Sequence, residues 1–257
     1  MDFGIQNRMS KIFQAETGKT VMLAVDHGYF QGPTTGLENL QKTIKPLAPL
    51  ADCLFVTRGM LRNCVDRNLK SSVCLRVSGG PSVLGELSNE DIVVSIEEAL
   101  RLNVSGVGMS IFVGAENEDR SIVNLGKLIN ESEKYGMPVL AITAVGREMV
   151  RDARYLGLAC RIASEIGARI VKTYYCEDFY RVVESCPVPI VMAGGKKIDE
   201  KDALIMTANA IKEGASGVDM GRNIFQSENP EAMMSAIKAI VHQGASASEA
   251  HKLFKVS

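Results

Sequence analysis

The sequence contains no tryptophan, and aromatic residues make up only 5% of its 257 positions. It also has no excess of basic charge, because 29 Lys and Arg residues face 30 Asp and Glu residues and leave a formal charge of −1. Proteins that hold phosphodiester backbones need a basic surface, and those that stack unpaired bases need aromatic side chains. Nucleic acid is therefore not expected as a partner.

Long hydrophobic runs are absent as well. The longest, residues 139–145 and 188–193, fall far short of the roughly 20 apolar residues that span a bilayer. Residues 1–11 are polar and of mixed charge, which is not the pattern of a signal peptide. We expect a cytoplasmic protein without a membrane partner.

Cysteine pairs of the CxxC type are missing, since neighbouring cysteines lie ten or more residues apart. The six are Cys53, Cys64, Cys74, Cys160, Cys176 and Cys186. Zinc sites need closely spaced ligands, and a chain of this length buries enough apolar surface to fold without disulfides. The sequence therefore predicts reduced thiols and no metal site.

No Gly/Ser linker, proline run or block of like charge divides the chain, which predicts one domain over residues 1–257 with short helical extensions at both ends. Eight apolar runs alternate with segments of helical period. The runs cover residues 20–25, 51–56, 72–77, 106–112, 138–143, 168–173, 189–192 and 215–220. Their apolar positions are continuous, as expected for strands covered on both faces. Eight such units predict an α/β fold, the (β/α)8 TIM barrel, in preference to a doubly wound sheet.

Capping residues mark the start of three predicted helices. Ser88, followed by Asp91, is a variant capping box before an apolar stripe, so a helix is predicted to begin there. Asp199 is suited to cap a second helix, and Asn229 with Pro230 supplies a cap and a first-turn proline for a third. The caps therefore predict helices after the third, seventh and eighth strands.

Polar residues end two of the predicted strands, and the carboxyl ends of barrel strands meet at one mouth. Asp26 and His27 follow the first strand and can relay protons there, or serve as a turn cap beside a hydrogen-bonded imidazole. Lys172 lies late in the sixth strand, where burial lowers the pKa of an amine and favours Schiff-base formation with a ketone. Alternatively, its head reaches the rim or pairs with Asp26 or Asp219.

Glycines and basic residues follow the last two strands. Gly194, Gly195 and Lys196 come after the seventh, and Gly221 and Arg222 come after the eighth. Backbone amides at glycines approach anions closely, and barrels commonly bind phosphate in these two loops. The pattern predicts a phosphorylated ligand, with flexible turns and exposed basic side chains as the alternative.

Weaker signals lie elsewhere in the chain. Arg58 ends the second strand and Ser78 ends the third, so each is a candidate substrate contact or simply part of a turn. Cys176 is close to Lys172 but is not assigned as a nucleophile, because nothing nearby is an obvious cause of a lowered thiol pKa. His242 is predicted to be an exposed polar residue.

These residues lie in segments that resemble the DhnA-type class I aldolases over nearly the whole chain. The matching segments read MLAVDHG at 22–28, IVKTYY at 170–175, AGGK at 193–196 and GVDMGRNIF at 217–225. Within the family, the resemblance is greatest to a branch that degrades a phosphorylated dione with coenzyme A. It rests on DHGYFQGPTTG at 26–36, KTYY at 172–175, CPVPIVMAGGKK at 186–197 and GASGVDMGRNIFQS at 214–227.

The resemblance implies a (β/α)8 barrel with Lys172 as the Schiff-base lysine and with acid/base help from Asp26 and His27. It implies that the phosphate is held by Gly195, Lys196, Gly221 and Arg222. The implied reaction transfers an acetyl group from 3-hydroxy-5-phosphonooxypentane-2,4-dione to coenzyme A, in the catabolism of autoinducer-2, and leaves dihydroxyacetone phosphate. Coenzyme A is then a co-substrate, no cofactor is bound permanently, and the assembly is a homo-oligomer, often a decamer.

One position departs from the wider family. Aldolases of this type commonly place a tyrosine at the end of the fifth strand, where this sequence has Ala144. Its absence argues against a plain fructose-bisphosphate aldolase and agrees with the coenzyme A branch. The acid/base group then remains open among His27, Tyr174 and Tyr175. A reversible aldolase and a non-catalytic phosphosugar-binding barrel stay as alternatives.

Overall fold

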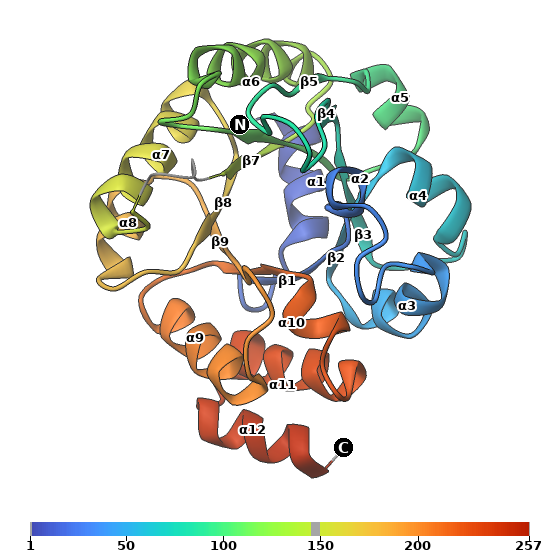
Figure 1. Ribbon diagram of the computed structural model, residues 1–257, viewed down its shortest axis with the longest axis vertical. Coiled ribbons are helices and arrows are strands. Elements are labelled where there is room, and N and C mark those ends of the chain that lie inside the picture. The colour runs from blue at the N-terminus through green and yellow to red at the C-terminus, as the bar shows by residue number, and fades with distance from the viewer. Residues whose placement is uncertain (1, 145–149, 257) are drawn as a thin grey trace.

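Eight parallel strands close into a barrel in the computed structural model, which describes residues 2–144 and 150–256 (Figure 1). Every predicted apolar run forms one of them, which confirms the TIM-barrel prediction. Around the barrel they are β1 (Thr20–Ala24), β10 (Gly217–Met220), β9 (Ile190–Ala193), β8 (Ile170–Tyr174), β7 (Val139–Thr143), β6 (Gly106–Ile111), β3 (Ser72–Arg76) and β2 (Cys53–Thr57). Their continuous apolar sequences follow from this placement, because helices cover the outer face and side chains fill the interior.

Helices surround the barrel on its outer side (Figure 1). They are α2 (Gly28–Gln31), α3 (Leu40–Leu47), α4 (Arg58–Cys64), α5 (Ile96–Arg101), α6 (Glu118–Glu133), α7 (Ala153–Ile166), α8 (Phe179–Ser185), α9 (Glu200–Lys212), α10 (Arg222–Phe225) and α11 (Pro230–Gln243), with a 3-10 turn at Ala48–Leu50. The last helix, α12 (Ala247–Val256), packs on α9 and α11. None of the helices within residues 2–144 and 150–256 is long and apolar enough to cross a membrane.

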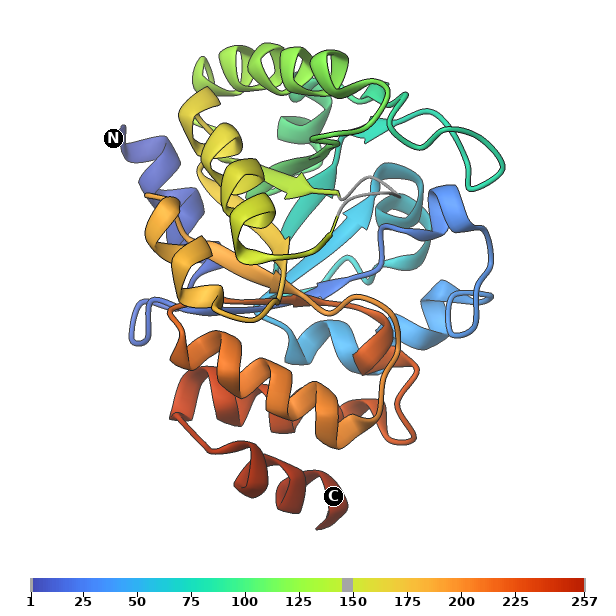
Figure 2. The ribbon, with the colours of Figure 1, turned by 60° about the vertical axis from the view of Figure 1, so that its left-hand side comes forward.

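The first helix, α1 (Phe3–Ile12), covers the end of the barrel at which the strands begin (Figure 2). Its last residue, Ile12, is fully buried with Phe13 against the interior side chains of the strands. Those side chains include Met22, Phe55 and Leu140. The core therefore fills this half of the barrel and leaves the opposite end, at the carboxyl ends of the strands, for the site.

Two predicted helix starts are confirmed. The Asp199 carboxylate accepts a hydrogen bond from the Lys201 backbone amide at the start of α9. The Asn229 side chain accepts one from the Ala232 amide at the start of α11, with Pro230 as the first helical residue. Each cap satisfies an amide that the helix leaves without an internal partner.

The predicted helix start at Ser88 is wrong, because α5 begins only at Ile96. Ser95 caps it by accepting from the Glu98 amide, so the true N-cap lies seven residues further along the chain. Residues 78–92 instead form a hairpin of β4 (Ser78–Gly79) and β5 (Asp91–Ile92), joined by a long loop beside the barrel mouth (Figure 2). The hairpin sets Glu90, 3% exposed, toward the barrel interior.

The prediction of an exposed His242 is also wrong. Its side chain is 8% exposed, and Nε2 lies 2.7 Å from Asp52 Oδ2 while Nδ1 lies 3.0 Å from Thr17 Oγ1. Helix α11 packs against β1 and thereby brings His242 to Asp52 at the start of β2. The interaction connects the last barrel helix to the amino ends of the first two strands.

Candidate active site

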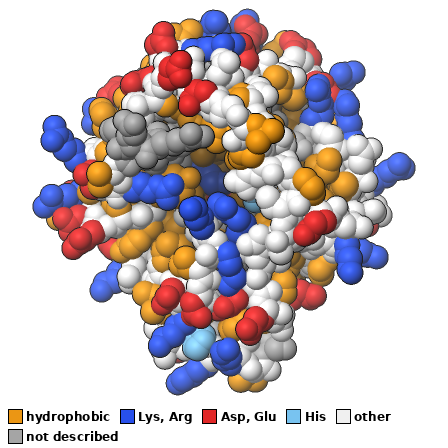
Figure 3. Space-filling view, in the orientation of Figure 1, with side chains coloured by type: hydrophobic (Ala, Val, Ile, Leu, Met, Phe, Trp, Pro, Cys, Tyr) orange, Lys and Arg blue, Asp and Glu red, His pale blue; other side chains and the backbone are white. Residues whose placement is uncertain are grey.

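A cavity of about 610 Å³ opens at the carboxyl ends of the strands (Figure 3). Eight of the ten residues predicted from the sequence line it. They are Asp26, His27, Lys172, Gly194, Gly195, Lys196, Gly221 and Arg222. Seven of the eight barrel strands contribute residues to its wall, β2 being the exception. Residues far apart in sequence meet here because the parallel strands all end at one rim.

Arg58 and Ser78 do not line the cavity. Arg58 begins α4 and points its guanidinium at Glu98, at 2.9 Å. Ser78 is buried and donates a hydrogen bond to Glu90 Oε2 at 2.7 Å. The structure therefore gives both residues protein partners and does not place them where a substrate would be contacted.

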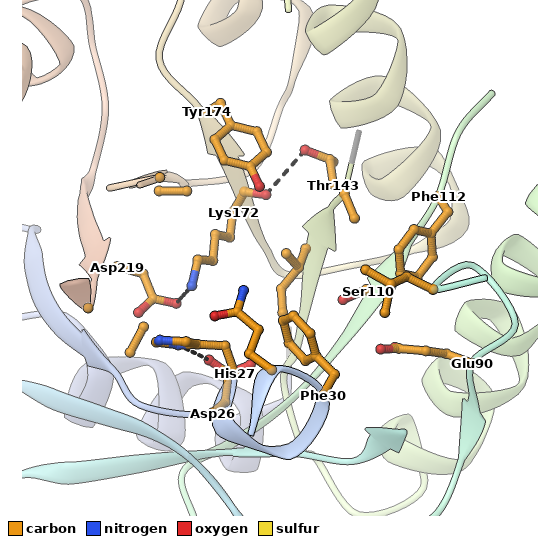
Figure 4. A pocket seen from close by; sticks show the side chains of 18 of the residues that line it. Asp26, His27, Phe30, Glu90, Ser110, Phe112, Thr143, Lys172, Tyr174 and Asp219 are labelled. Atoms are coloured by element: carbon orange, nitrogen blue, oxygen red, sulfur yellow. Dashed lines mark hydrogen bonds and ion pairs between the residues drawn. The ribbon is translucent and has the colours of Figure 1, made fainter. Parts of the chain in front are cut away.

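Lys172 extends from β8 into the cavity (Figure 4). Ile170 belongs to the interior core, and side chains alternate along a strand, so Lys172 also faces inward, one layer nearer the mouth. Its residue is 9% exposed, and Nζ lies 2.8 Å from Asp219 Oδ2. The ion pair that the sequence left as an alternative is thus present, and the amine still borders the cavity.

Asp219 comes from β10 and is 1% exposed. Burial raises the pKa of its carboxyl, and the ammonium of Lys172 opposes this effect only in part. Among the described residues no hydrogen-bond donor other than that ammonium approaches either carboxylate oxygen. A carboxylate with a raised pKa is a better acceptor of the lysine proton than an ordinary aspartate.

Asp26 is held by Arg76, a residue that sequence analysis missed. Burial alone would raise the pKa of Asp26, but the guanidinium of Arg76, 2.7 Å from Oδ2, outweighs it together with Lys172 and keeps the pKa below its usual value. The same guanidinium donates to Glu90 at 2.6 Å and to Ser110 at 2.8 Å. The sequence did contain a signal for Arg76, because it is a charged residue inside the apolar run of β3. The same kind of signal identified Lys172.

His27 is a neutral imidazole at neutral pH. Burial lowers its pKa to about 4, and the positive charges of Arg222, Lys172 and Arg76 add to this, against the opposing effect of Asp26. Nδ1 lies 4.0 Å from Asp26 Oδ1, and buried Nε2 has no hydrogen-bond partner in the described part of the chain. The ring is thus able to accept a proton or a hydrogen bond from a ligand.

This lowered pKa predicts a dependence of stability on pH. Between pH 6.5 and about 4, His27 is protonated in the unfolded chain but stays neutral in the folded protein. The free energy of unfolding therefore falls as the pH is lowered through this range. His27→Asn is expected to remove about 2–3 kcal/mol of that fall. Urea unfolding across this pH range measures it, with His251→Asn on α12 as the control. Parallel stability curves for wild type and His27→Asn would contradict the assignment.

The anion-binding end of the cavity joins the loops after β9 and β10. Asn223 Nδ2 donates to the Gly194 carbonyl at 2.6 Å, and its Oδ1 accepts from the Ile198 amide at 2.9 Å, so one buried amide side chain fixes both loops. Gly221 is required there, because a Cβ atom would lie 2.3 Å from the Ala24 carbonyl oxygen. Lys196 and Arg222 border the same part of the cavity and supply positive charge.

Only some of the residues considered for acid/base chemistry line the cavity. Tyr174 lines the cavity, with the Arg151 guanidinium 3.9 Å from the centre of its ring. Tyr175 does not, and its hydroxyl donates to Glu213 at 2.7 Å. Ala144, which follows β7, also lines the cavity, and it is the position at which the family resemblance leads one to expect a tyrosine. His27 and Tyr174 therefore remain as candidates.

Cys176 is 8% exposed and absent from the cavity wall. Burial raises the pKa of its thiol to about 11, so the thiol is protonated at neutral pH. No group of three or more His, Cys, Asp and Glu side chains in residues 2–144 and 150–256 is arranged to hold a metal ion. The titratable side chains that line the cavity include the amine of Lys172, the carboxyls of Asp26 and Asp219, the imidazole of His27 and the phenol of Tyr174.

Comparison with known proteins identifies the family of the chain. The DeoC/LacD family aldolase profile matches residues 20–227. The 3-hydroxy-5-phosphonooxypentane-2,4-dione thiolase of Photorhabdus laumondii is 55% identical, with 99% of this chain and 88% of that protein aligned. The thiolase of the same name from Escherichia coli K12 is 54% identical over the same shares.

A solved structure gives the same fold. An archaeal fructose-1,6-bisphosphate aldolase, with its catalytic lysine covalently bound to the carbinolamine intermediate, superposes with a TM-score of 0.81 at 26% identity. The match covers 92% of this chain and 99% of that one. Together with the profile match over most of the barrel, these relatives establish that the chain is an enzyme of the DeoC/LacD aldolase family.

Proposed function

We propose that this enzyme cleaves 3-hydroxy-5-phosphonooxypentane-2,4-dione with coenzyme A, forming acetyl-CoA and dihydroxyacetone phosphate through a Schiff base on Lys172. The observation that carries the proposal is a buried lysine whose Nζ borders the cavity 2.8 Å from Asp219, beside the loops that can hold a phosphate. The names of the relatives at 54–55% identity supply the substrate.

Phosphate binding comes first in this mechanism. Lys196 and Arg222 supply charge, and the backbone amides at Gly194 and Gly195 can donate to phosphate oxygens. Anchoring this end sets the neighbouring ketone over β8, where Lys172 lies. The binding energy of the phosphate is thereby used to orient the reacting carbons.

Lys172 then adds to the ketone beside the phosphate-bearing carbon and expels water, giving an iminium. The raised pKa of Asp219 helps its carboxylate take the proton that the ammonium must lose. Coenzyme A loses its thiol proton, and its sulphur adds to the second ketone. The bond between that carbon and the hydroxyl-bearing carbon breaks, and its electron pair moves into the iminium to form an enamine.

A proton returns to the hydroxyl-bearing carbon, and water hydrolyses the regenerated iminium. Dihydroxyacetone phosphate leaves, the amine is restored, and the water released in the first step is consumed in the last. His27 and Tyr174 are the cavity residues we propose for the proton transfers, His27 because its neutral ring has a free Nε2 in the described part of the chain.

The test measures acetyl-CoA and dihydroxyacetone phosphate after incubation with the dione and coenzyme A. We expect equal amounts of the two products and a borohydride-reducible adduct on the peptide that carries Lys172. An adduct with dihydroxyacetone phosphate but no acetyl-CoA would favour a reversible aldolase. Phosphate-ligand binding without any adduct would favour a non-catalytic phosphosugar-binding barrel.

The cellular setting follows from this reaction. We propose that the enzyme acts in autoinducer-2 catabolism in the cytoplasm. We also propose that it forms a homo-oligomer, and the family resemblance implies a decamer. Light scattering of the purified protein measures the mass of the assembly. A mass of 27.8 kDa, that of one chain, would contradict the oligomer.

A further inference from the structure

The cavity has two chemically different ends, and they face each other across the barrel. In the closed strand order, β6 stands opposite β10 and β3 stands opposite β9. The anion-binding loops follow β9 and β10, whereas Phe112 follows β6 and Leu87 lies in the long loop between β4 and β5, which follow β3. Figure 4 shows Phe112 and Asp219 on opposite sides of the cavity, with Lys172 extending in from β8.

The end far from the phosphate carries three large apolar side chains beside the polar side chains of Arg76, Glu90 and Ser110. Phe112 is 8% exposed, Leu87 and Phe30 are partly buried, and all three line the cavity. We call Phe30, Leu87 and Phe112 the acceptor wall. Ala144, which follows β7, also lines the cavity and has only a methyl side chain. A substrate anchored by its phosphate at β9 and β10 would extend its acetyl group toward this wall.

We propose that the acceptor wall binds the pantetheine arm of coenzyme A and directs its sulphur at the acetyl carbonyl. This inference rests on the proposed function, which requires a thiol to reach the carbonyl farthest from the phosphate. A pantetheine arm is long, uncharged and rich in methylene groups, so apolar walls suit it.

Charge at the rim indicates where the phosphates of coenzyme A lie. Arg151 lines the cavity, is exposed, and stacks 3.9 Å from the ring centre of Tyr174 at the end of β8. Glu86 and Glu116 border the rim near the acceptor wall and disfavour anions there. Lys and Arg side chains gather beside the hollow of the mouth in Figure 3. The phosphates are therefore assigned to Arg151.

Leu87→Ala is the first test, and Leu84→Ala is its matched control. The two leucines share one loop, but Leu84 is 95% exposed and does not line the cavity. Leu87→Ala is expected to raise KM for coenzyme A by about fivefold to tenfold, as expected for losing part of one apolar contact. Leu84→Ala is expected to leave that KM unchanged. The yield of the borohydride-trapped adduct with dihydroxyacetone phosphate should be equal in both variants, which also verifies folding.

Arg151→Gln tests the rim, with coenzyme A and pantetheine compared as acceptors. Because pantetheine lacks the phosphates, this variant should raise KM for coenzyme A by about tenfold and leave KM for pantetheine unchanged. Phe112→Leu should raise KM for both acceptors.

Two results would overturn the inference while leaving the proposed function intact. One is formation of acetyl-CoA by Leu87→Ala with the KM of Leu84→Ala. The other is a raised KM for the dione, rather than for coenzyme A, in Leu87→Ala and Phe112→Leu. A wild-type enzyme that traps dihydroxyacetone phosphate but makes no acetyl-CoA would overturn the proposed function and this inference with it.

Discussion

Lys172→Arg is expected to lower the rate of acetyl-CoA formation by at least about a thousandfold, because a guanidinium stays protonated and cannot add to a ketone. The substitution preserves the positive charge that faces Asp219 across 2.8 Å. A lysine that served only as a charge partner would tolerate it. Steady-state assay of acetyl-CoA, with borohydride trapping and peptide mass spectrometry on the same samples, measures both the rate and the adduct.

Lys172→Met controls for the size of the new side chain. It also leaves Asp219 buried without its ammonium partner, so its stability should fall unless the carboxyl is protonated. The double variant Lys172→Met/Asp219→Asn removes that charge and should recover stability without recovering activity. Appreciable turnover by Lys172→Arg, or an adduct on another lysine, would refute the covalent mechanism.

Arg76→Met is expected to lower the free energy of unfolding by about 3–5 kcal/mol, the usual cost of removing one partner from a buried ion pair. Arg76 is 5% exposed and contacts both Asp26, at 2.7 Å, and Glu90, at 2.6 Å. Without it, Glu90 loses its ion-pair partner, and Asp26 keeps only the charge of Lys172 to oppose the effect of burial. Chemical unfolding at neutral pH measures the loss.

The pH dependence of this loss has a definite sign. In the wild type, the pKa of Asp26 is held below its usual value, so the ion pair stabilises the protein at neutral pH and this contribution disappears as the pH falls through the folded pKa. In Arg76→Met, burial dominates and raises that pKa, which makes ionisation of Asp26 destabilising. The difference between wild type and variant should therefore be largest near neutral pH and should shrink in acid.

Arg120→Met is the matched control for Arg76→Met. Arg120 and Asp91 also lie 2.7 Å apart, but their side chains are 46% and 54% exposed. Exposed pairs of this kind contribute about 1 kcal/mol or less. Equal losses for the two variants would show that burial does not decide the strength of the Arg76 network.

The barrel and eight residues of the cavity wall could be predicted from the sequence. Apolar runs and their spacing predicted every barrel strand but not the β4–β5 hairpin. The carboxyl ends of β1, β8, β9 and β10 then supplied the predicted residues that line the mouth. Lys172 and Arg222 were found in this way because their positions depend only on strand direction and order. Parallel strands that close into a barrel place all such ends at one rim, so local patterns suffice.

Tertiary structure alone decided which polar side chains pair and which remain available to a ligand. Arg76 contacts Asp26, 50 positions away in sequence, and Lys172 contacts Asp219. Arg58 and Ser78 do not line the cavity for the same reason. Arg58 pairs with the carboxylate of Glu98, and Ser78 donates to that of Glu90. A side chain at a strand end can adopt several conformations. Its conformation depends on charged partners from other segments, which lie near it only in the folded protein. That choice also separates the anion-binding end of the cavity from the acceptor wall, which no local motif in the sequence marks.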